Sequence, residues 1–256
     1  MESVTRRRFL WMLAGAAGLG GWAFWRLPSE EPAPVAGAST TTSTTPSTST
    51  VATVPVPTTI PTPPVVLEVI ERNGWGARAA AAGFGTHVIE RMTIHHTAVA
   101  LPDNRAAPAR LRGHQAYHQE QGWPDVAYHF SIDRGGNVYE ARPYTAPGDT
   151  FTDYDPSGHF LPVLEGNYGE QQPTEAQIES LVRLLAWASA EFGVATDTIA
   201  GHRDYAATTC PGDSVYSLVA DGSIRRRVDD RIESGGVEMV VLRGDAALAR
   251  VAGIEA

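Results

Sequence analysis

The spacing of apolar residues changes at about Val66. Before that point no pattern could bury a core, and after it strand-like and helix-like spacings alternate along the chain. Met92 and Ile94 alternate with polar neighbours and predict a strand over residues 88–96. Further elements are predicted as a helix over 104–121, hairpin strands over 126–132 and 137–141, strands over 159–167 and 198–201, and a short helix over 214–220. Strands interleaved with helices predict an α/β fold in which a mixed central β-sheet is flanked by helices.

Residues 174–193 give the clearest helix. Thr174 and Gln177 have the spacing of a capping box at its start, and Gly193 marks its end. One apolar stripe runs along it, formed by Ile178, Leu181, Val182, Leu185 and Ala188. Pro162 interrupts the strand before this helix, which predicts an edge strand or a bulge.

Two N-terminal segments precede a predicted domain of residues 67–232. A C-terminal tail, residues 233–256, follows it; the tail has one possible strand over 237–242 and no chemistry that predicts a role. Residues 1–38 contain a cluster of three consecutive arginines, Arg6 to Arg8, and then an apolar run over 9–25, a pattern that resembles a twin-arginine export signal. The run is short for a bilayer span, so the segment is predicted to be a cleaved signal or a membrane anchor, and the only membrane contact. Residues 39–66 are nearly all Ser, Thr, Pro and Val and predict an extended tether.

The charge and the cysteine count narrow the classes of function. The formal net charge is −9, and the basic Arg6 to Arg8 cluster lies in the leader, so the predicted domain is more acidic still. Such a domain lacks the basic surface that binds nucleic acid, so nucleic-acid binding is excluded from the expected functions. The single cysteine, Cys210, has no partner for an internal disulfide, which leaves packing, metal binding or nucleophilic catalysis. Export favours a thiolate held by a metal. We expect a monomer.

Three residues form a candidate metal site. His95 lies at the end of the predicted strand 88–96, and His202 and Cys210 lie eight positions apart (210 − 202) on one loop. Zinc takes histidine nitrogen and cysteine sulfur, and a catalytic zinc keeps three protein ligands and one open position. The spacing alone also fits a chance set of residues. His95 and His96 point to opposite faces of a regular strand, so only one of them is expected to reach the ion.

Several motifs resemble the type 2 N-acetylmuramoyl-L-alanine amidase family, which includes animal peptidoglycan recognition proteins and phage lysozyme-amidases. The resemblance extends from about Glu71 to Tyr216. Its motifs are Asn-Gly-Trp-Gly-Ala-Arg at 73–78, Ile-His-His-Thr-Ala at 94–98, Val-Ala-Tyr-His-Phe at 126–130, Gly-Asn-Tyr at 166–168, and the spacing from His202 to Cys210. The resemblance implies a zinc amidase domain that cuts the bond between N-acetylmuramic acid and L-alanine in peptidoglycan. The expected location is then extracytoplasmic and associated with the cell wall.

The resemblance also implies roles for individual residues. Zinc (Zn²⁺) is held by His95, His202 and Cys210, and Tyr128 lies beside it as a hydrogen-bond donor. Thr208 occupies a position where phage members have lysine, so its hydroxyl stabilises an oxyanion without a full charge. Candidates for substrate binding are Trp123, Asp125, His159, Glu165 and Asn167. Arg203 and Asp204 are expected to order the loop of His202, since a metal-bound histidine usually needs an outer hydrogen-bond acceptor.

Purely structural roles remain open as alternatives to these functional ones. Tyr128 and Trp123 also suit a core, His96 and His129 suit packed or hydrogen-bonded positions, and His114 and His118 suit a solvated or groove-lining helix face. The main alternative function is a peptidoglycan-binding module without hydrolysis. A cysteine hydrolase would use Cys210 with His202 and no metal. A structural zinc site would need a fourth ligand, which has no candidate at suitable spacing.

Overall fold

The structure is a computed structural model that describes residues 62–81 and 83–256. The predicted leader and nearly all of the predicted tether lie outside these residues. Within the described ranges, no helix combines the length and the apolar character that crossing a bilayer requires.

The described residues form one eight-stranded mixed sheet, which confirms the predicted fold class. The paired strands follow the order β5-β2-β6-β3-β4-β1-β8, with β7 also paired to β2. Only β3 and β4 pair antiparallel, because they form the predicted hairpin. The strands are β1 (Val65–Ile70), β2 (Arg91–His96), β3 (Phe130–Ile132), β4 (Val138–Glu140), β5 (His159–Phe160), β6 (Pro162–Leu164), β7 (Ile199–Gly201) and β8 (Val237–Leu242).

The predicted strand over 159–167 is interrupted at Leu161, directly before Pro162, but it does not lie at an edge. His159 of β5 pairs with Arg91, and Val163 of β6 pairs with His95, so both halves keep one offset of 68 positions along β2 (159 − 91 and 163 − 95). The two strands therefore act as one broken strand. Pro162 pairs with Phe130 of β3 on the other side, which places the break inside the sheet. Proline is tolerated there as the first residue of β6.

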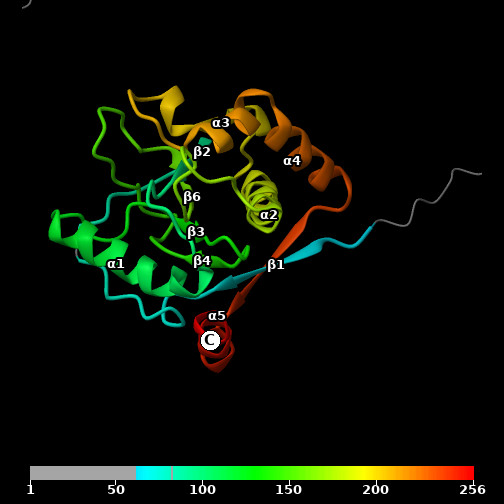
Figure 1. Cartoon of the computed structure of the whole chain (residues 1–256). Helices are drawn as coiled ribbons and strands as arrows, with labels where there is room; N and C mark the ends of the chain where they lie inside the picture. Colours follow the sequence, from blue (N-terminus) through cyan, green and yellow to red (C-terminus); the bar gives the residue numbers. More distant parts are fainter. Residues whose placement is uncertain (1–61, 82) are drawn as a thin grey trace, which may run out of the picture. The chain divides into compact units, whose positions relative to one another are not determined.

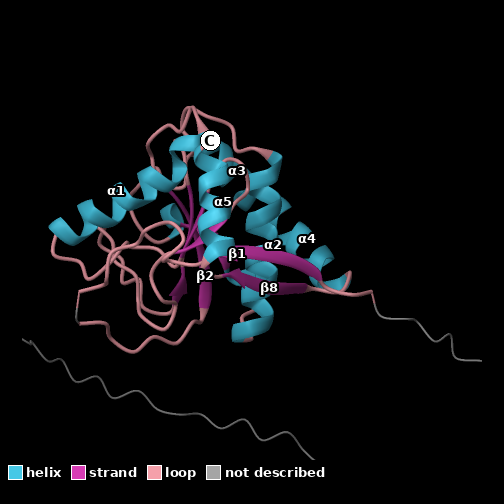
Figure 2. Ribbon diagram, turned by 90° about the horizontal axis from the view of Figure 1, so that it is seen from below, coloured by secondary structure: helices cyan, strands magenta, loops and turns pink. Residues whose placement is uncertain are grey.

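Helices cover both faces of the sheet (Figures 1 and 2). On one face α2, α3 and α4 pack on a large core that includes Ile94, Phe160 and Leu181. On the other, α1 and α5 cover a smaller core around Trp75 and Tyr139. The helices are α1 (Ala107–Glu120), α2 (Glu175–Phe192), α3 (Asp213–Ala220), α4 (Ser223–Glu233) and α5 (Asp245–Glu255), with 3-10 turns η1 (Asn104–Ala106), η2 (Thr196–Thr198) and η3 (His202–Asp204).

Only half of the predicted capping box forms at the start of α2. The Thr174 hydroxyl accepts from the backbone N–H of Gln177 at 3.1 Å, as expected. The Gln177 side chain is fully buried and instead donates to the carbonyl of Ile132 at 2.8 Å. A buried amide must find its partners in the core, and here it joins α2 to β3. Gly193 ends the helix in the left-handed conformation, with φ of 65°.

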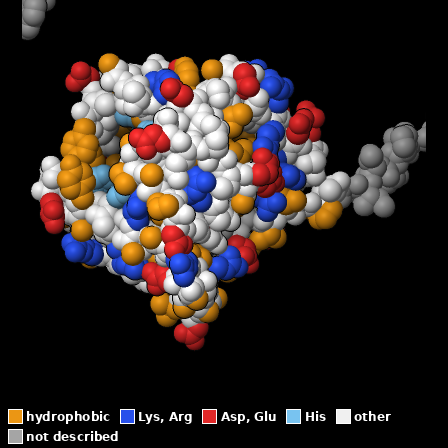
Figure 3. Space-filling view, in the orientation of Figure 1, with side chains coloured by type: hydrophobic (Ala, Val, Ile, Leu, Met, Phe, Trp, Pro, Cys, Tyr) orange, Lys and Arg blue, Asp and Glu red, His pale blue; other side chains and the backbone are white. Residues whose placement is uncertain are grey.

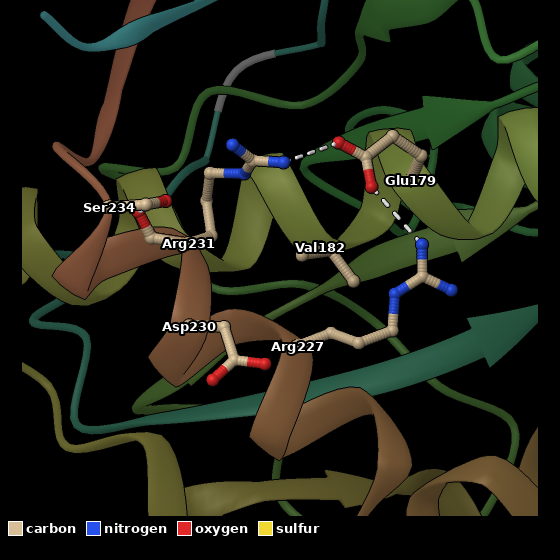
Figure 4. A pocket seen from close by; sticks show the side chains of 6 residues that line it. All are labelled: Glu179, Val182, Arg227, Asp230, Arg231 and Ser234. Atoms are coloured by element: carbon tan, nitrogen blue, oxygen red, sulfur yellow. Dashed lines mark hydrogen bonds and ion pairs between the residues drawn. The ribbon is translucent and has the colours of Figure 1, made fainter. Parts of the chain in front are cut away.

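A hollow between α2 and α4 is filled by an ion-pair network (Figure 4). Arg227 and Arg231 of α4 lie 3.1 and 3.0 Å from the carboxylate of Glu179 on α2. Both arginines pair with that one carboxylate, so the residues around the hollow join α4 to α2.

The two ends of the described chain meet in the sheet. β1 begins at Val65, within the segment predicted as tether, and pairs in parallel with β8 over six residues. Residues 233–256, which were assigned no role, supply β8 and α5, and Ala247 and Val251 of α5 are buried. These residues complete one edge of the sheet and cover part of one face.

Candidate functional site

The register of two parallel strands brings two histidines together. Ile94 of β2 pairs with Gly201 of β7, so the next residues along each strand are His95 and His202. Both lie at the carboxyl ends of their strands, the edge at which α/β sheets place their ligand sites. Cys210 reaches the same point from the loop between η3 and α3. His95, His202 and Cys210 are called the metal cluster below.

The geometry of the metal cluster fits a zinc ion. One potential ligand atom from each residue lies within 4.8 Å of the other two. His95 Nδ1 is 3.7 Å from Cys210 Sγ. Zinc bonds of about 2.0–2.3 Å in tetrahedral geometry imply a separation of about 3.6 Å between two such ligands. All three side chains are at least nine-tenths buried, which suits ligands rather than surface groups.

The protonation states also suit a cation. Burial lowers the pKa of His95 well below its usual value, and the neighbouring His202 lowers it further. Burial lowers the pKa of His202 to about 4. Both imidazoles are therefore neutral at pH 7 and have a lone pair to offer. Burial raises the pKa of the Cys210 thiol to about 12, so a free thiolate is disfavoured and a bound divalent cation is what would deprotonate it.

Backbone contacts fix Cys210 in place. The N–H of His96 points at Cys210 Sγ at 3.4 Å, and the N–H of Cys210 donates to Thr208 Oγ1 at 3.2 Å. The backbone N–H of Arg203 donates to the Cys210 carbonyl at 3.0 Å. Asp204 accepts from the N–H of Gly201 at 2.8 Å. Arg203 and Asp204 thus order the loop as expected, although through its backbone and not through the imidazole of His202.

A groove of about 360 Å³ opens beside the metal cluster. It runs between the carboxyl ends of the strands and α1, and its walls are largely aromatic. In Figure 3, histidine surface lies next to hydrophobic side chains on the side of the molecule where α1 lies. The wall residues used below are Tyr117, His118, Trp123, Tyr128, Phe151 and Thr208.

Tyr128 lines the groove next to the metal cluster, with its ring centroid 5.1 Å from that of His95. It lies just before β3 and not within a strand, contrary to the predicted strand over 126–132. At the start of the predicted strand, the Arg142 guanidinium binds the carbonyl of Val126 at 2.8 Å, and it also binds that of the preceding Asp125 at 3.0 Å. Burial, reinforced by Cys210, raises the pKa of Tyr128 above its usual range, so the hydroxyl remains a donor.

The predicted substrate contacts divide into two groups. Trp123 lines the groove and stacks against Phe151, with 4.2 Å between ring centroids. Asp125 does not line it. That carboxylate is fully buried and pairs with Arg72 at 2.9 Å and with Gln115 at 2.7 Å, which makes it a structural ion pair.

Three further candidates also lie outside the groove lining. His159 is buried on the far side of the metal cluster and bonds Thr93 Oγ1 at 2.7 Å. Glu165 is buried beneath the groove, where it accepts from Ser131 at 2.8 Å and lies 3.5 Å from His114. Asn167 accepts from the N–H of Gly169 at 3.1 Å and orders its own loop. These residues were predicted as substrate contacts because they lie near a motif, but most of their polar atoms bond within the fold. Glu165 Oε2 is buried without a hydrogen-bond partner among the described residues.

The remaining histidines lie in the packed, hydrogen-bonded or groove-lining positions that were expected for them. His96 Nδ1 accepts from the N–H of Tyr168 at 3.2 Å. His129 accepts from the N–H of Leu161 at 3.0 Å and lies 3.0 Å from the carbonyl of Ala146. His114 and His118 line the groove from α1.

One part of the site was not predicted from the sequence. Residues 148–158, the last part of the connection from β4 to β5, contribute Phe151 and Thr152 to the groove. Tyr154, from the same segment, reaches His95. The segment has no apolar periodicity of a helix or strand and no motif, and the exposed aromatic Phe151 is what hints at a binding surface.

Comparison with known proteins agrees with this site. A family profile described as N-acetylmuramoyl-L-alanine amidase matches residues 85–213, which contain the whole metal cluster. The chain belongs to that family. Peptidoglycan-recognition protein SC2 of Drosophila melanogaster is 33% identical over 155 residues, 59% of this chain and 84% of that protein. A human N-acetylmuramoyl-L-alanine amidase is 33% identical over 132 residues, 49% of this chain and 23% of that protein.

A solved structure of a related protein has the same fold as this chain. The crystal structure of Drosophila peptidoglycan recognition protein SD superposes with a TM-score of 0.55 at 27% identity, over 59% of this chain and 92% of that one. The relatives bear both names, amidase and peptidoglycan-recognition protein. The matched residues 85–213 exclude β1, α4, β8 and α5.

Proposed function

We propose that this protein is an exported, zinc-dependent amidase that hydrolyses the bond between N-acetylmuramic acid and L-alanine in peptidoglycan. The observation that supports it most is the buried metal cluster at the end of an aromatic groove, with Tyr128 beside it. Two neutral imidazoles and one cysteine would hold zinc and leave one position for water. Zinc bound there supplies a Lewis acid and a water of lowered pKa.

The residues of the chain divide the remaining work. Tyr128 holds its proton and faces the groove, so it donates to the oxygen that becomes negative as the amide carbon turns tetrahedral. Thr208 accepts from the N–H of Cys210, which leaves its own hydroxyl hydrogen for the same oxygen. Trp123 and Phe151 form an aromatic wall against which a sugar or peptide chain can pack.

The alternatives fit the site less well. A cysteine hydrolase needs a thiolate, and burial of Cys210 opposes one in the absence of a metal. A structural zinc site needs a fourth protein ligand, whereas the described residues offer only three that could share an ion. A binding module without hydrolysis would use the same groove, and the complete His-His-Cys set favours the enzyme.

One experiment separates hydrolysis from binding. The purified full-length chain with zinc is incubated with peptidoglycan, and the soluble products are analysed by mass spectrometry. We expect stem peptides with a free N-terminal L-alanine and glycan strands without peptides. The Cys210→Ala variant should release neither, since it lacks one ligand. Bound but uncut peptidoglycan with the wild-type chain would instead establish a binding module.

A further inference from the structure

Two hydroxyl groups of the 148–158 segment reach the two histidines of the metal cluster. Thr152 Oγ1 lies 2.9 Å from His202 Nε2. The Tyr154 hydroxyl lies 3.4 Å from His95 Nε2, a longer and weaker contact. In both histidines the contacted atom is Nε2. For His95, the other ring nitrogen, Nδ1, faces Cys210 Sγ.

A neutral imidazole can bind a metal through only one of its two ring nitrogens. One ring nitrogen has the proton and the other has the lone pair, and only the lone pair can bind a metal. A hydroxyl oxygen that accepts from Nε2–H therefore fixes the lone pair on Nδ1. Histidine ligands generally need such an outer acceptor, and Arg203 and Asp204 bond the backbone of the loop instead.

We propose that Thr152 and Tyr154 are positioning residues that set the tautomers of His202 and His95, so that both bind zinc through Nδ1. The inference rests on the proposed zinc binding. Thr152 is the stronger of the two because its contact is the shorter one.

The 148–158 segment is ordered by hydrogen bonds within itself and by packing against the histidines. Thr150 Oγ1 accepts from the N–H of Thr152 at 3.0 Å and lies 2.7 Å from its hydroxyl. The ring of Tyr154 packs against His202 and His159, at centroid distances of 4.9 and 5.1 Å. Phe151 points the other way, to the stack with Trp123 in the groove. One segment therefore forms part of the groove wall and orients the ligands.

The first test measures zinc affinity. The metal-free full-length chain competes with a chromogenic chelator for zinc, with Thr152→Val and Tyr154→Phe as the variants. Loss of an outer partner typically weakens metal affinity about 10–100-fold, which we expect for Thr152→Val. Tyr154→Phe should weaken it less. Thr152→Ser keeps the hydroxyl and should bind as the wild type does.

Tyr205→Phe is the matched control for the tyrosine. Tyr205 packs against Tyr154 and against His159, with 6.1 and 4.7 Å between ring centroids. Within the described residues its hydroxyl makes no hydrogen bond to the metal cluster, so zinc affinity should be unchanged. Thermal unfolding of each metal-free variant reports any general loss of folding.

The second test observes the tautomers directly. In the zinc-loaded chain, long-range ¹H–¹⁵N spectra of the histidine rings should show Nδ1 bound to metal and Nε2 protonated in His95 and His202. Zinc on Nε2 of His202, or wild-type affinity in Thr152→Val, would overturn this inference and leave the amidase proposal intact. A wild-type chain that binds no zinc would overturn both.

Discussion

Tyr128 and the metal cluster make different demands on their surroundings. The cluster needs lone pairs and a thiolate, whereas Tyr128 needs to keep its proton. Burial serves the two histidines and the tyrosine, because it lowers the pKa of the histidines and raises that of the tyrosine. Burial also raises the pKa of Cys210, so the thiolate would need the bound ion. The result is a donor that stays neutral beside two imidazoles that stay unprotonated. The Tyr128 hydroxyl is therefore suited to stabilising charge that develops only during the reaction.

Replacing Tyr128 by phenylalanine tests that role. If the hydroxyl donates mainly in the transition state, turnover should fall by roughly 10²–10³, the range for losing one such donor. The ring remains, so zinc content and peptidoglycan affinity should stay near the wild-type values. Zinc analysis, a binding assay and product release are measured on the one variant. Wild-type turnover would remove Tyr128 from the mechanism and leave the metal cluster untouched.

For single residues, the sequence predicts the metal ligands better than the substrate contacts. Cysteine and histidine have few possible roles, whereas common polar residues have many. A lone cysteine with two spaced histidines allows few roles, and the structure brings all three together. Asp125 and His159 were predicted as substrate contacts from their place near motifs. Their burial depends on Arg72 and Thr93, distant in sequence, and no local pattern reveals such partners.

The elements follow their local signals where those signals are strong. Gly193 ends α2 as predicted, and the strand predicted over 237–242 matches β8 in both bounds. β1 was missed because valines of a Pro- and Thr-rich segment lead into it without a break, and because its partner β8 lies at the other end of the chain. Parallel pairing over that distance leaves no trace in local spacing.

The packing of α5 on the domain can be tested at Gly74. A Cβ at Gly74 would lie 2.5 Å from the Cβ of Ala247, so Gly74→Ala forces α5 away from the turn after β1. Overpacking of this kind typically costs about 1–3 kcal/mol. The free energy of unfolding is measured by denaturant titration at fixed zinc concentration, where the midpoint should fall.

Gly113→Ala is the matched control for that substitution. Gly113 is exposed in α1, and a Cβ there meets nothing within 4 Å. Alanine in a helix interior is favoured over glycine by roughly 0.5–1 kcal/mol, so this variant should gain stability. Equal stability of Gly74→Ala and the wild type would mean that α5 does not pack where the structure has it.

On the scale of the whole molecule, the proposed place of action follows from the leader. Residues 1–38 lie outside the described residues, and their role remains a prediction from the arginines and the apolar run. Replacing Arg6 and Arg7 by lysine keeps the charge and removes the twin-arginine pattern. Cell fractionation with immunoblotting should then find the variant retained in the cytoplasm. Normal export of the double variant would contradict the twin-arginine assignment.

Zinc should also stabilise the folded molecule as a whole. The ligands lie 115 positions apart (210 − 95), so the ion would join β2 to the segment between β7 and α3. An ion that binds only the folded state adds about 2.7 kcal/mol at a concentration 100 times its dissociation constant. At roughly 2–4 °C per kcal/mol for a domain of this size, chelation should lower Tm by roughly 5–10 °C. Calorimetry with and without chelator measures the shift, and Cys210→Ala should melt at one low temperature in both conditions. A Tm that is independent of zinc in the wild type would mean that the metal cluster does not bind the ion tightly enough to serve as the proposed catalytic centre.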